Sequence, residues 1–474
     1  MPTCRPQAAA FSIGGMTRAP APHEVRPDTA HALLERVARA QASGRAPSLS
    51  VAVVRDGAVA WSAGRGLVDQ APPTTDTQYR IGSITKGFTA VLVMRLRDEG
   101  RLSLEDRLDQ HVPGTAFGDR TIGDLLAHSA GLAAEPPGPW WERSPGKPWA
   151  ELAETLKPSS LLRPSGRFHY SNVGYGLLGE LVARHRGSSW YEALRSEVLE
   201  PLEMRRTTYS AETPAAPGLA VHPFADIVMP EQVQDLGAMA AAGQLWSTVA
   251  DLGRWIGLVG GDSADVVAAD TVAEMRQTQV IADDPTWQSG YGLGFQVLRP
   301  GDRELVGHGG SVPGFLAMIV VDAERRTGTV ELANVTSGAV LCGAELLGIL
   351  QDHEPAVART WQPVDVPADV LQLTGLWHWG PTAFLLRLRG NDRLELAPAG
   401  GGAGRATRFR LASDGSWTGL DGYWRGETLR PVRRGDGSLS HLDIATFVLT
   451  RTPYDPDAPI PGGVPPDPWH TALP

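Results

Sequence analysis

The sequence predicts an α+β domain followed by a small all-β module. A helical pattern over 31–41 precedes two apolar strands, 50–55 and 58–63, and a buried helix follows from about residue 86. The strands are joined by Asp56-Gly57, a strong hairpin signal. A helix followed by antiparallel strands indicates an α+β domain rather than repeated βαβ units. Beyond residue 355, short alternating segments separated by turns indicate a β-barrel or β-sandwich.

Local signals predict the remaining elements. Thr121 begins a capping box and Thr248 caps another helix, because each threonine is followed three residues later by an acidic residue. The segment 172–185 has a helical pattern, and 315–321 and 328–334 are expected to pair as strands. In the second module we expect strands at 384–389, 393–397, 407–411, 428–433 and 441–449, with Trp377, Trp379, Trp417 and Trp424 in its core.

Composition divides the chain into five parts. We expect a disordered N-terminus over 1–25, the α+β domain over 26–355, and a Pro- and Val-rich linker over 356–370. The β-barrel-like domain follows over 371–452, and a Pro-rich tail over 453–474.

The overall composition is that of an ordinary soluble globular protein. Among 474 residues, the formal net charge of −10 argues against nucleic acid or an anionic membrane as partner. Two cysteines are compatible with a reducing compartment, so we expect a cytoplasmic protein. No His, Cys or carboxylate cluster has metal-ligand spacing, so we expect neither metal nor cofactor. The oligomeric state stays open.

The strongest chemical signal is Ser83-Ile84-Thr85-Lys86 at the start of the buried helix. The chain holds only three lysines among 43 basic residues, so the use of lysine rather than arginine at position 86 indicates a chemical role. Burial can lower the pKa of a lysine enough for it to act as a base, which arginine cannot do. Three residues are nearly one helical turn, so Ser83 and Lys86 can share a face as nucleophile and base. Ser144-Pro145-Gly146-Lys147 has the same spacing, but its Pro-Gly centre predicts a turn.

Two further motifs can complete a site for acyl transfer. Tyr170-Ser171-Asn172 offers a phenol that a nearby lysine cation would favour as phenolate, followed by an amide that can contact a carbonyl or an ammonium. His308-Gly309-Gly310-Ser311 precedes a strand, and its glycines allow a ligand to approach the Ser311 N–H. Acyl transfer needs such proton-transfer and oxyanion groups beside its nucleophile.

These three motifs, in this order, resemble the serine β-lactamase and penicillin-binding-protein superfamily. The resemblance covers about residues 30 to 350 and is closest to class C β-lactamase-related esterases and D-aminopeptidase-like serine hydrolases. It also takes in Leu125-Leu126-Ala127-His128-Ser129, Gly243-Gln244-Leu245-Trp246-Ser247 and Tyr291-Gly292-Leu293-Gly294. It implies an antiparallel sheet flanked by helices, with an all-helical subdomain.

The resemblance also implies a mechanism. Ser83 would be the acyl-enzyme nucleophile and Lys86 its proton acceptor, with Tyr170 sharing that role or protonating the leaving group. Asn172 would position Lys86 and the substrate carbonyl. The N–H groups of Ser83 and Ser311, next to Gly310, would form the oxyanion hole.

One position departs from the β-lactamase pattern. His308 stands where such enzymes carry the lysine of a Lys-Thr-Gly triplet, so the cation that grips a β-lactam carboxylate is missing. The resemblance therefore implies a serine hydrolase that cleaves an ester or amide of a small molecule or a peptide, as an esterase or D-amino-acid peptidase. Acyl transfer to an amine, by a transpeptidase or peptide-cyclising thioesterase, and a catalytically silent binding protein remain alternatives.

Each candidate residue also has a purely structural interpretation. Ser83 can be a helix cap, Tyr170 a packing aromatic and Asn172 an Asx cap. His308 is a catalytic candidate that would either transfer a proton or contact the substrate, but it can also precede a strand without chemistry. His128 follows a capped apolar helix and is interpreted as structural. Trp140 and Trp141 either line a substrate cleft or anchor a loop.

Overall fold

The computed structural model describes residues 24–455, except 163, 264–265, 284–285, 302, 337–340, 356–360, 390–392, 402–403 and 413–414. The chain divides into two compact units at residue 357. Most of the predicted N-terminal segment and Pro-rich tail, and part of the linker, lie outside the described residues. Val25, the last residue of that N-terminal segment, is buried and its N–H donates to the carbonyl of Ala60.

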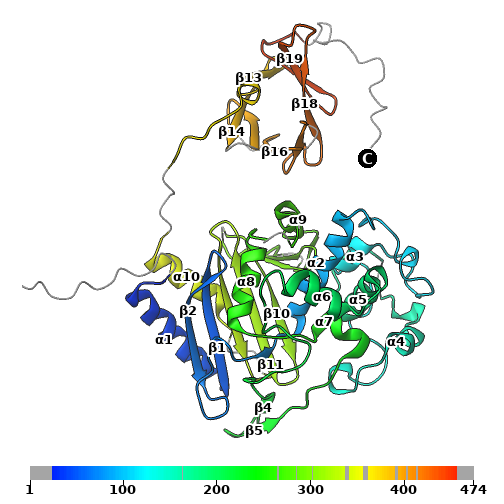
Figure 1. Cartoon of the computed structure of the whole chain (residues 1–474), viewed down its shortest axis with the longest axis vertical. Helices are drawn as coiled ribbons and strands as arrows, with labels where there is room; N and C mark the ends of the chain where they lie inside the picture. The colour runs from blue at the N-terminus through cyan, green and yellow to red at the C-terminus, as the bar shows by residue number, and fades with distance from the viewer. Residues whose placement is uncertain are drawn as a thin grey trace, which may run out of the picture. The chain divides into compact units, whose positions relative to one another are not determined.

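The first unit is built around an eight-stranded antiparallel sheet, which confirms the predicted fold class (Figure 1). The strand order is β2-β1-β12-β11-β10-β9-β8-β7. In that order the strands span Ala58–Gly66, Ser48–Arg55, Thr327–Ala333, Phe315–Asp322, Leu305–Val312, Gln296–Leu298, Ser289–Tyr291 and Val280–Ile281. The hairpin between β1 and β2 turns at Asp56 and Gly57, which both have positive φ, as an Asp-Gly turn requires.

Because successive side chains of β1 point to opposite faces of the sheet, the strand contributes to two hydrophobic cores. Leu49, Val51 and Val53 pack with helices α1 (Pro27–Ser43) and α10 (Gly343–His353), whereas Ala52 and Val54 face α8 (Val249–Val259) and the main core. The sheet is therefore covered by helices on both faces. The main core extends from this second face into the helices that carry the predicted site.

These helices form the helical part of the first unit. They are α2 (Thr85–Asp98), α3 (Ile122–Leu126), α4 (Trp149–Thr155), α5 (Asn172–Arg186), α6 (Trp190–Leu194), α7 (Ala240–Gly243) and α9 (Ala269–Met275). The predicted caps are present: the hydroxyls of Thr121 and Thr248 accept the N–H groups of Asp124 and Asp251, each at 3.1 Å. Two small two-stranded sheets, β3 (Tyr79–Arg80) with β6 (Trp246–Ser247) and β4 (Leu219–Val221) with β5 (Val228–Pro230), complete the unit.

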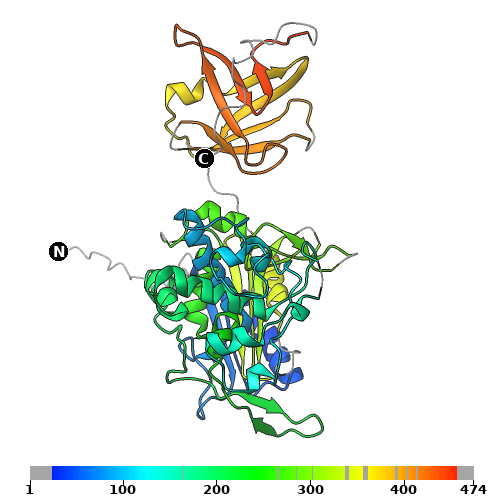
Figure 2. The ribbon, with the colours of Figure 1, turned by 90° about the vertical axis from the view of Figure 1, so that its right-hand side faces the viewer.

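The second unit is a closed eight-stranded barrel, seen from the side in Figure 2. After α11 (Ala368–Leu371), its strands β13 to β20 span Gly375–Trp379, Thr382–Arg389, Arg393–Pro398, Thr407–Leu411, Trp417–Gly419, Thr428–Arg433, Leu439–Ile444 and Phe447–Thr450. Trp377, Trp417 and Trp424 are buried in its core, as predicted, but Trp379 is 37% exposed. The single strand expected over 441–449 is two strands, because the chain turns at Ala445 with a φ of 51°.

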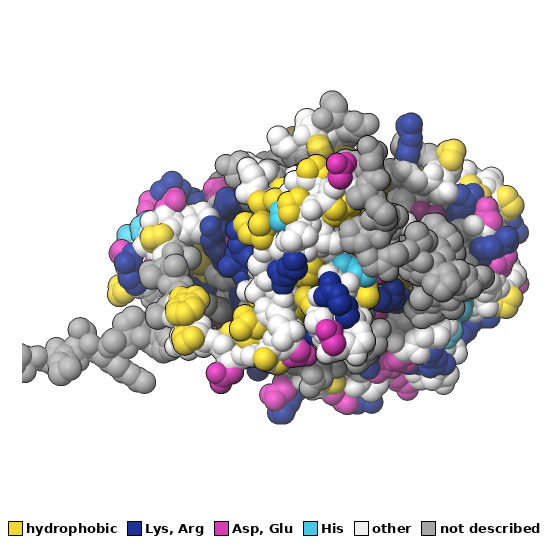
Figure 3. All heavy atoms as spheres, turned by 90° about the horizontal axis from the view of Figure 1, so that it is seen from above, with side chains coloured by type: hydrophobic (Ala, Val, Ile, Leu, Met, Phe, Trp, Pro, Cys, Tyr) yellow, Lys and Arg dark blue, Asp and Glu magenta, His cyan; other side chains and the backbone are white. Residues whose placement is uncertain are grey.

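Charge is spread rather than concentrated on the face shown in Figure 3, where acidic and basic side chains are interspersed. Within the described residues, no helix combines the length and apolar character that crossing a bilayer requires.

Candidate active site

Ser83 and Lys86 meet at the N-terminal end of α2. Ser83 lies in a 3₁₀ turn, Gly82–Ile84, that runs directly into the helix, and Lys86 lies in the first helical turn. Lys86 Nζ donates to Ser83 Oγ at 3.0 Å and to the carbonyl of Ala242 at 2.7 Å. Lys86 is fully buried, whereas Ser83 is partly exposed, so the hydroxyl is accessible and the amine is not.

Burial sets the protonation state of Lys86. Removal from water lowers the pKa of Lys86 to about 7, and the negative charges of Glu135 and Glu142 oppose this shift. An amine with a pKa near 7 is partly neutral at physiological pH and can accept the proton of its hydrogen-bonded serine. The sequence-based expectation of a desolvated lysine base therefore has a structural cause.

Two glycines let β10 approach the serine. A Cβ on Gly82 would lie 2.8 Å from the Ser311 nitrogen, and a Cβ on Gly310 would lie 1.9 Å from the carbonyl oxygen of Ile81. Gly82 also has a φ of 52°. The N–H of Gly309 donates to Gln296 Oε1 at 3.2 Å, toward the β9 edge. Since alternate N–H groups of a strand point the same way, the Ser311 N–H points to that edge as well.

Tyr170 is hydrogen-bonded to Ser83, and its ring centroid lies 4.9 Å from Lys86 Nζ. Burial raises the pKa of Tyr170 above its ordinary value of 10, and the nearby Glu135 and Glu142 raise it further. The net shift is upward because desolvation outweighs the stabilising interaction with Ser83, so the phenolate that a lysine cation was expected to favour is not the form present at neutral pH. Tyr170 is a protonated phenol at neutral pH, and so a proton donor.

The amide of Asn172 is hydrogen-bonded to Glu135 and not to Lys86, in contrast to the positioning role that the resemblance implied. Its Nδ2 donates to both carboxylate oxygens of Glu135, at 3.0 and 3.1 Å. Lys86 has its hydrogen bonds with Ser83 and Ala242 instead. Asn172 opens α5 after the Ser171 N-cap, so the helix start fixes its amide beside the carboxylate.

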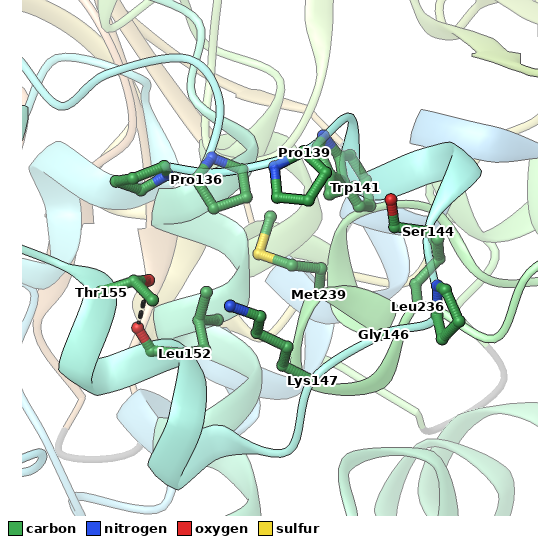
Figure 4. Close-up of a pocket in the computed structure, with 12 residues that line it drawn as sticks. Pro136, Pro139, Trp141, Ser144, Gly146, Lys147, Leu152, Thr155, Leu236 and Met239 are labelled. Carbon is green, nitrogen blue, oxygen red and sulfur yellow. Dashed lines mark hydrogen bonds between the residues drawn. The ribbon is translucent and has the colours of Figure 1, made fainter.

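Glu135 and Glu142 form an acidic pair beside the lysine that no spacing in the sequence indicated. The indole N–H of Trp141 donates to Glu135, and that of Trp140 donates to Glu142 at 3.0 Å. Burial and the neighbouring Glu135 raise the pKa of Glu142. Both tryptophans thus anchor the loop, and Trp141 also lines a pocket with Pro136, Pro139, Leu152 and Met239 (Figure 4).

His308 is neutral and both of its ring nitrogens are engaged. Burial and the charge on Lys86 lower the pKa of His308 to about 3. Its Nδ1 lies 2.6 Å from the carbonyl oxygen of Gly309 and must donate, because a carbonyl only accepts. Nε2 therefore accepts the Tyr291 hydroxyl at 2.8 Å. This geometry favours a positioning role over the proton-transfer role considered for His308.

His128 packs beneath the site, in agreement with its structural interpretation. Its ring centroid lies 4.2 Å from that of Tyr170 and 4.5 Å from that of Tyr291. Its Nδ1 accepts the Ser171 N–H at 3.1 Å, and burial keeps the pKa of His128 well below its usual value. The histidine thus supports both Tyr170 and the start of α5. Among the described residues, no cluster of His, Cys, Asp or Glu is arranged to hold a metal ion.

Comparison with known proteins identifies the family. The family model described as Beta-lactamase matches residues 33–346, which is most of the chain. The chain belongs to the β-lactamase family. A second model, a domain of unknown function named DUF7586, matches residues 366–451, which include all eight barrel strands.

Among curated proteins, this β-lactamase family member is 26% identical over 312 residues to Protein flp of Staphylococcus aureus (strain MW2), covering 62% of this chain and 61% of the relative. The chain thus spans about three fifths of that relative. Penicillin-binding protein 4 of Amycolatopsis lactamdurans is 27% identical over 333 residues, with coverage of 62% of this chain and 83% of the relative.

Solved structures show the same fold. The octameric penicillin-binding protein homologue from Pyrococcus abyssi has a TM-score of 0.59 at 22% identity, over 88% of this chain and 99% of the other. The D-amino acid amidase from Ochrobactrum anthropi, complexed with L-phenylalanine amide, has a TM-score of 0.59 at 23% identity, over 69% and 98%. SurE has a TM-score of 0.57 at 24% identity, over 90% and 99%.

Proposed function

We propose that this protein is a serine hydrolase that cleaves an amide or ester through an acyl intermediate on Ser83. The observation that carries the proposal is the 3.0 Å hydrogen bond between Ser83 and a fully buried Lys86 whose pKa is lowered to about 7. A hydroxyl beside a desolvated amine is an activated nucleophile. Membership of the β-lactamase family supports the same chemistry.

The first half of the reaction forms the acyl-enzyme. Ser83 Oγ attacks the carbonyl carbon, and its proton passes to the neutral amine of Lys86. The N–H groups of Ser83 and Ser311 stabilise the negative charge that develops on the carbonyl oxygen. Tyr170, held protonated by burial, gives its proton to the leaving amine or alcohol as the bond to the carbonyl carbon breaks. The proton on Lys86 then restores the phenol.

The second half releases the acid. A water molecule attacks the acyl carbon and gives up a proton to the Lys86–Tyr170 pair. The bond to Ser83 Oγ breaks, and the serine takes a proton back from Lys86. The product is a carboxylic acid, and each residue returns to its starting protonation state.

The acidic pair supports a substrate class. Glu135 and Glu142 place two carboxylates where they act on Lys86 and Tyr170, and Glu135 is oriented by Asn172 and Trp141. Carboxylates beside a reacting carbonyl attract a substrate that carries an ammonium group there. We therefore propose amides and esters with a free amino group next to the scissile carbonyl. The D-amino acid amidase among the structural neighbours supports this choice.

The nucleophile is tested with a fluorophosphonate probe and intact-protein mass spectrometry. We expect one adduct, mapped to Ser83, on the wild type and on the Ser144→Ala variant, and none on Ser83→Ala. Ser144 is the matched control because it also precedes a lysine by three residues. An adduct on Ser83→Ala would overturn the assignment of the nucleophile. No adduct on any form would favour the silent-binding alternative.

The substrate class is tested with aminoacyl p-nitroanilides of both configurations and their N-acetyl forms. We expect kcat/KM to be at least tenfold higher for the free amines, since a charge-assisted contact is worth about this factor. Glu135→Gln should lower kcat/KM for the free amines about tenfold and leave the N-acetyl forms nearly unchanged. Equal losses for both substrate types would show that Glu135 only supports the fold.

Acyl transfer is the second candidate, because the same carboxylates would attract an acceptor amine to the acyl-enzyme. Product analysis with a peptidyl ester decides between the two. Release of acid alone at every amine concentration supports hydrolysis. A transfer product that grows with added amine, at unchanged ester consumption, supports transfer.

A further inference from the structure

One end of the C-terminal barrel carries a guanidinium enclosed by three aromatic rings. The Arg405 guanidinium carbon lies 4.6 Å from the ring centroid of Trp379, 5.0 Å from that of Tyr423 and 5.1 Å from that of Phe447. We call these four residues the arginine cage. It lies outside the catalytic unit and does not depend on the proposed hydrolase chemistry.

The barrel topology brings the cage together from four connections. Trp379 ends β13, Arg405 precedes β16, Tyr423 lies between β17 and β18, and Phe447 begins β20. Since consecutive strands of the barrel are antiparallel, all four positions fall at the same end of it. Below them, the buried Trp424 packs 5.3 Å from Phe447 and closes the cage toward the barrel core. Ends of β-barrels are common places for ligand sites.

The cage is open to solvent, and none of the described acidic residues pairs with its guanidinium. Trp379 is 37% exposed and Tyr423 is 58% exposed. Two other arginines of the barrel pair with carboxylates, Arg389 with Glu395 and Arg408 with Asp421. Within the described part of the chain, Arg405 has neither an ion pair nor a hydrogen bond, and its guanidinium lies against the three rings.

The backbone of Arg405 is also held in an unfavourable conformation. Its φ of 61° is in the left-handed region, which side chains other than glycine, asparagine and aspartate rarely adopt. Such a conformation persists where the surrounding structure enforces it, and functional sites are common among these places. The strained backbone and the three rings together define where the guanidinium lies.

A guanidinium stacked on rings keeps its N–H edge available for an anion. Its fork matches a planar carboxylate with two parallel hydrogen bonds. The surrounding domain favours anions, because residues 371–452 contain eleven arginines and seven acidic residues, in a chain whose net charge is −10. Only one cation lies in the described cage, which suits a monoanion better than a phosphate dianion.

We propose that the arginine cage binds the C-terminal carboxylate of a peptide that ends in an apolar residue. The carboxylate would pair with the Arg405 fork, and the terminal side chain would lie against the exposed faces of Trp379 and Tyr423. The rings supply apolar contact area and the guanidinium supplies charge and direction, which together recognise a chain end rather than a bare anion.

Saturation-transfer NMR titration of the full-length chain tests this site. The Ser83→Ala background prevents turnover, and the probes are N-acetylphenylalanine and its C-terminal amide. We expect the acid to bind with a dissociation constant near the millimolar range and the amide at least tenfold more weakly. Arg405→Gln should weaken the acid at least tenfold, since a charge-assisted bidentate contact is lost. Arg425→Gln is the matched control, an exposed arginine on the β17–β18 connection, and should change affinity less than twofold.

Three results would overturn the proposal. Equal binding of acid and amide would exclude carboxylate recognition. Equal affinities of Arg405→Gln and Arg425→Gln would place the probe elsewhere. Stronger binding of inorganic phosphate, or of N-acetylglutamic acid α-amide through its side chain, would replace the C-terminal carboxylate with another ligand. If Arg405→Gln does not fold, Tyr423→Ala tests the same site, because losing one wall should also weaken the acid.

Discussion

Two segments of this chain place a lysine three residues after a serine, and only one of them brings the two side chains into a hydrogen bond. Ser83 and Lys86 lie on a continuous helical path, and the buried amine donates to the hydroxyl at 3.0 Å. Ser144 has an extended backbone, and the exposed Lys147 extends into the pocket of Figure 4, away from Ser144. The comparison shows that this spacing alone does not make a nucleophile and base. A helical turn must bring the two side chains together, and burial must lower the pKa of the amine.

Replacing lysine with arginine at positions 86 and 147 should give the largest difference in activity between the two segments. Lys86→Arg keeps the charge but removes the base, because arginine does not deprotonate in proteins. We expect kcat/KM to fall about 10²–10⁴-fold, the usual contribution of a general base. Lys147→Arg should retain wild-type activity within about twofold, as an exposed surface substitution does. Activity of Lys86→Arg above one tenth of wild type would mean that another group takes the proton.

The pH dependence of kcat/KM tests Lys86 separately from Lys147, because only Lys86 is expected to take part in proton transfer. Its neutral form is the active one, and burial lowers the pKa of Lys86 to about 7. As the pH falls through 7 the amine becomes protonated, so kcat/KM should decrease about tenfold per pH unit below that value. Since the pKa of Tyr170 lies above 10, no loss from this phenol is expected up to pH 9. A rate that is constant from pH 5 to 8 would contradict a lysine base.

Local signals explain which parts of the fold could be predicted. The Asp56-Gly57 hairpin and the Thr121 and Thr248 caps depend on contacts within a few residues, and the structure contains all three. Among the barrel strands, β13 and β17 were not predicted, and the three residues of β17 are too few to show an alternating pattern. The turn at Ala445 was also missed, because alanine carries no turn signal.

The candidate site also has contacts that the sequence could predict and contacts that it could not. Ser83 and Lys86 lie within one helical turn, so their spacing in the sequence was enough to predict the contact. The order of the motifs was enough to predict that Tyr170 and Ser311 belong to the same site. Glu135 reaches Asn172 across 37 positions, and no pattern in one sequence encodes that distance. Desolvation of Tyr170 was equally hidden, because it depends on how His128 and Tyr291 pack around the ring.

The smallest expected effect is on stability, where burial of Lys86 has a cost that exposed Lys147 does not share. The pKa of Lys86 is lowered from 10.5 to about 7 on folding. Below pH 7 both states are protonated and the full penalty is present. Between pH 7 and 10.5 the unfolded state binds more protons, so stability rises with pH.

Lys86→Met removes this penalty while keeping the volume. Calorimetry of the full chain should show the catalytic unit melting a few degrees higher at pH 6, about 2–4 °C for each kcal/mol gained. The gain should shrink toward pH 10, where the wild-type lysine is neutral in the folded state, and Lys147→Met should show no such trend. A Lys86→Met variant less stable than wild type at pH 6 would mean that the hydrogen bonds to Ser83 and Ala242 outweigh desolvation. The expected result would instead show a buried base retained for its reactivity at the expense of stability.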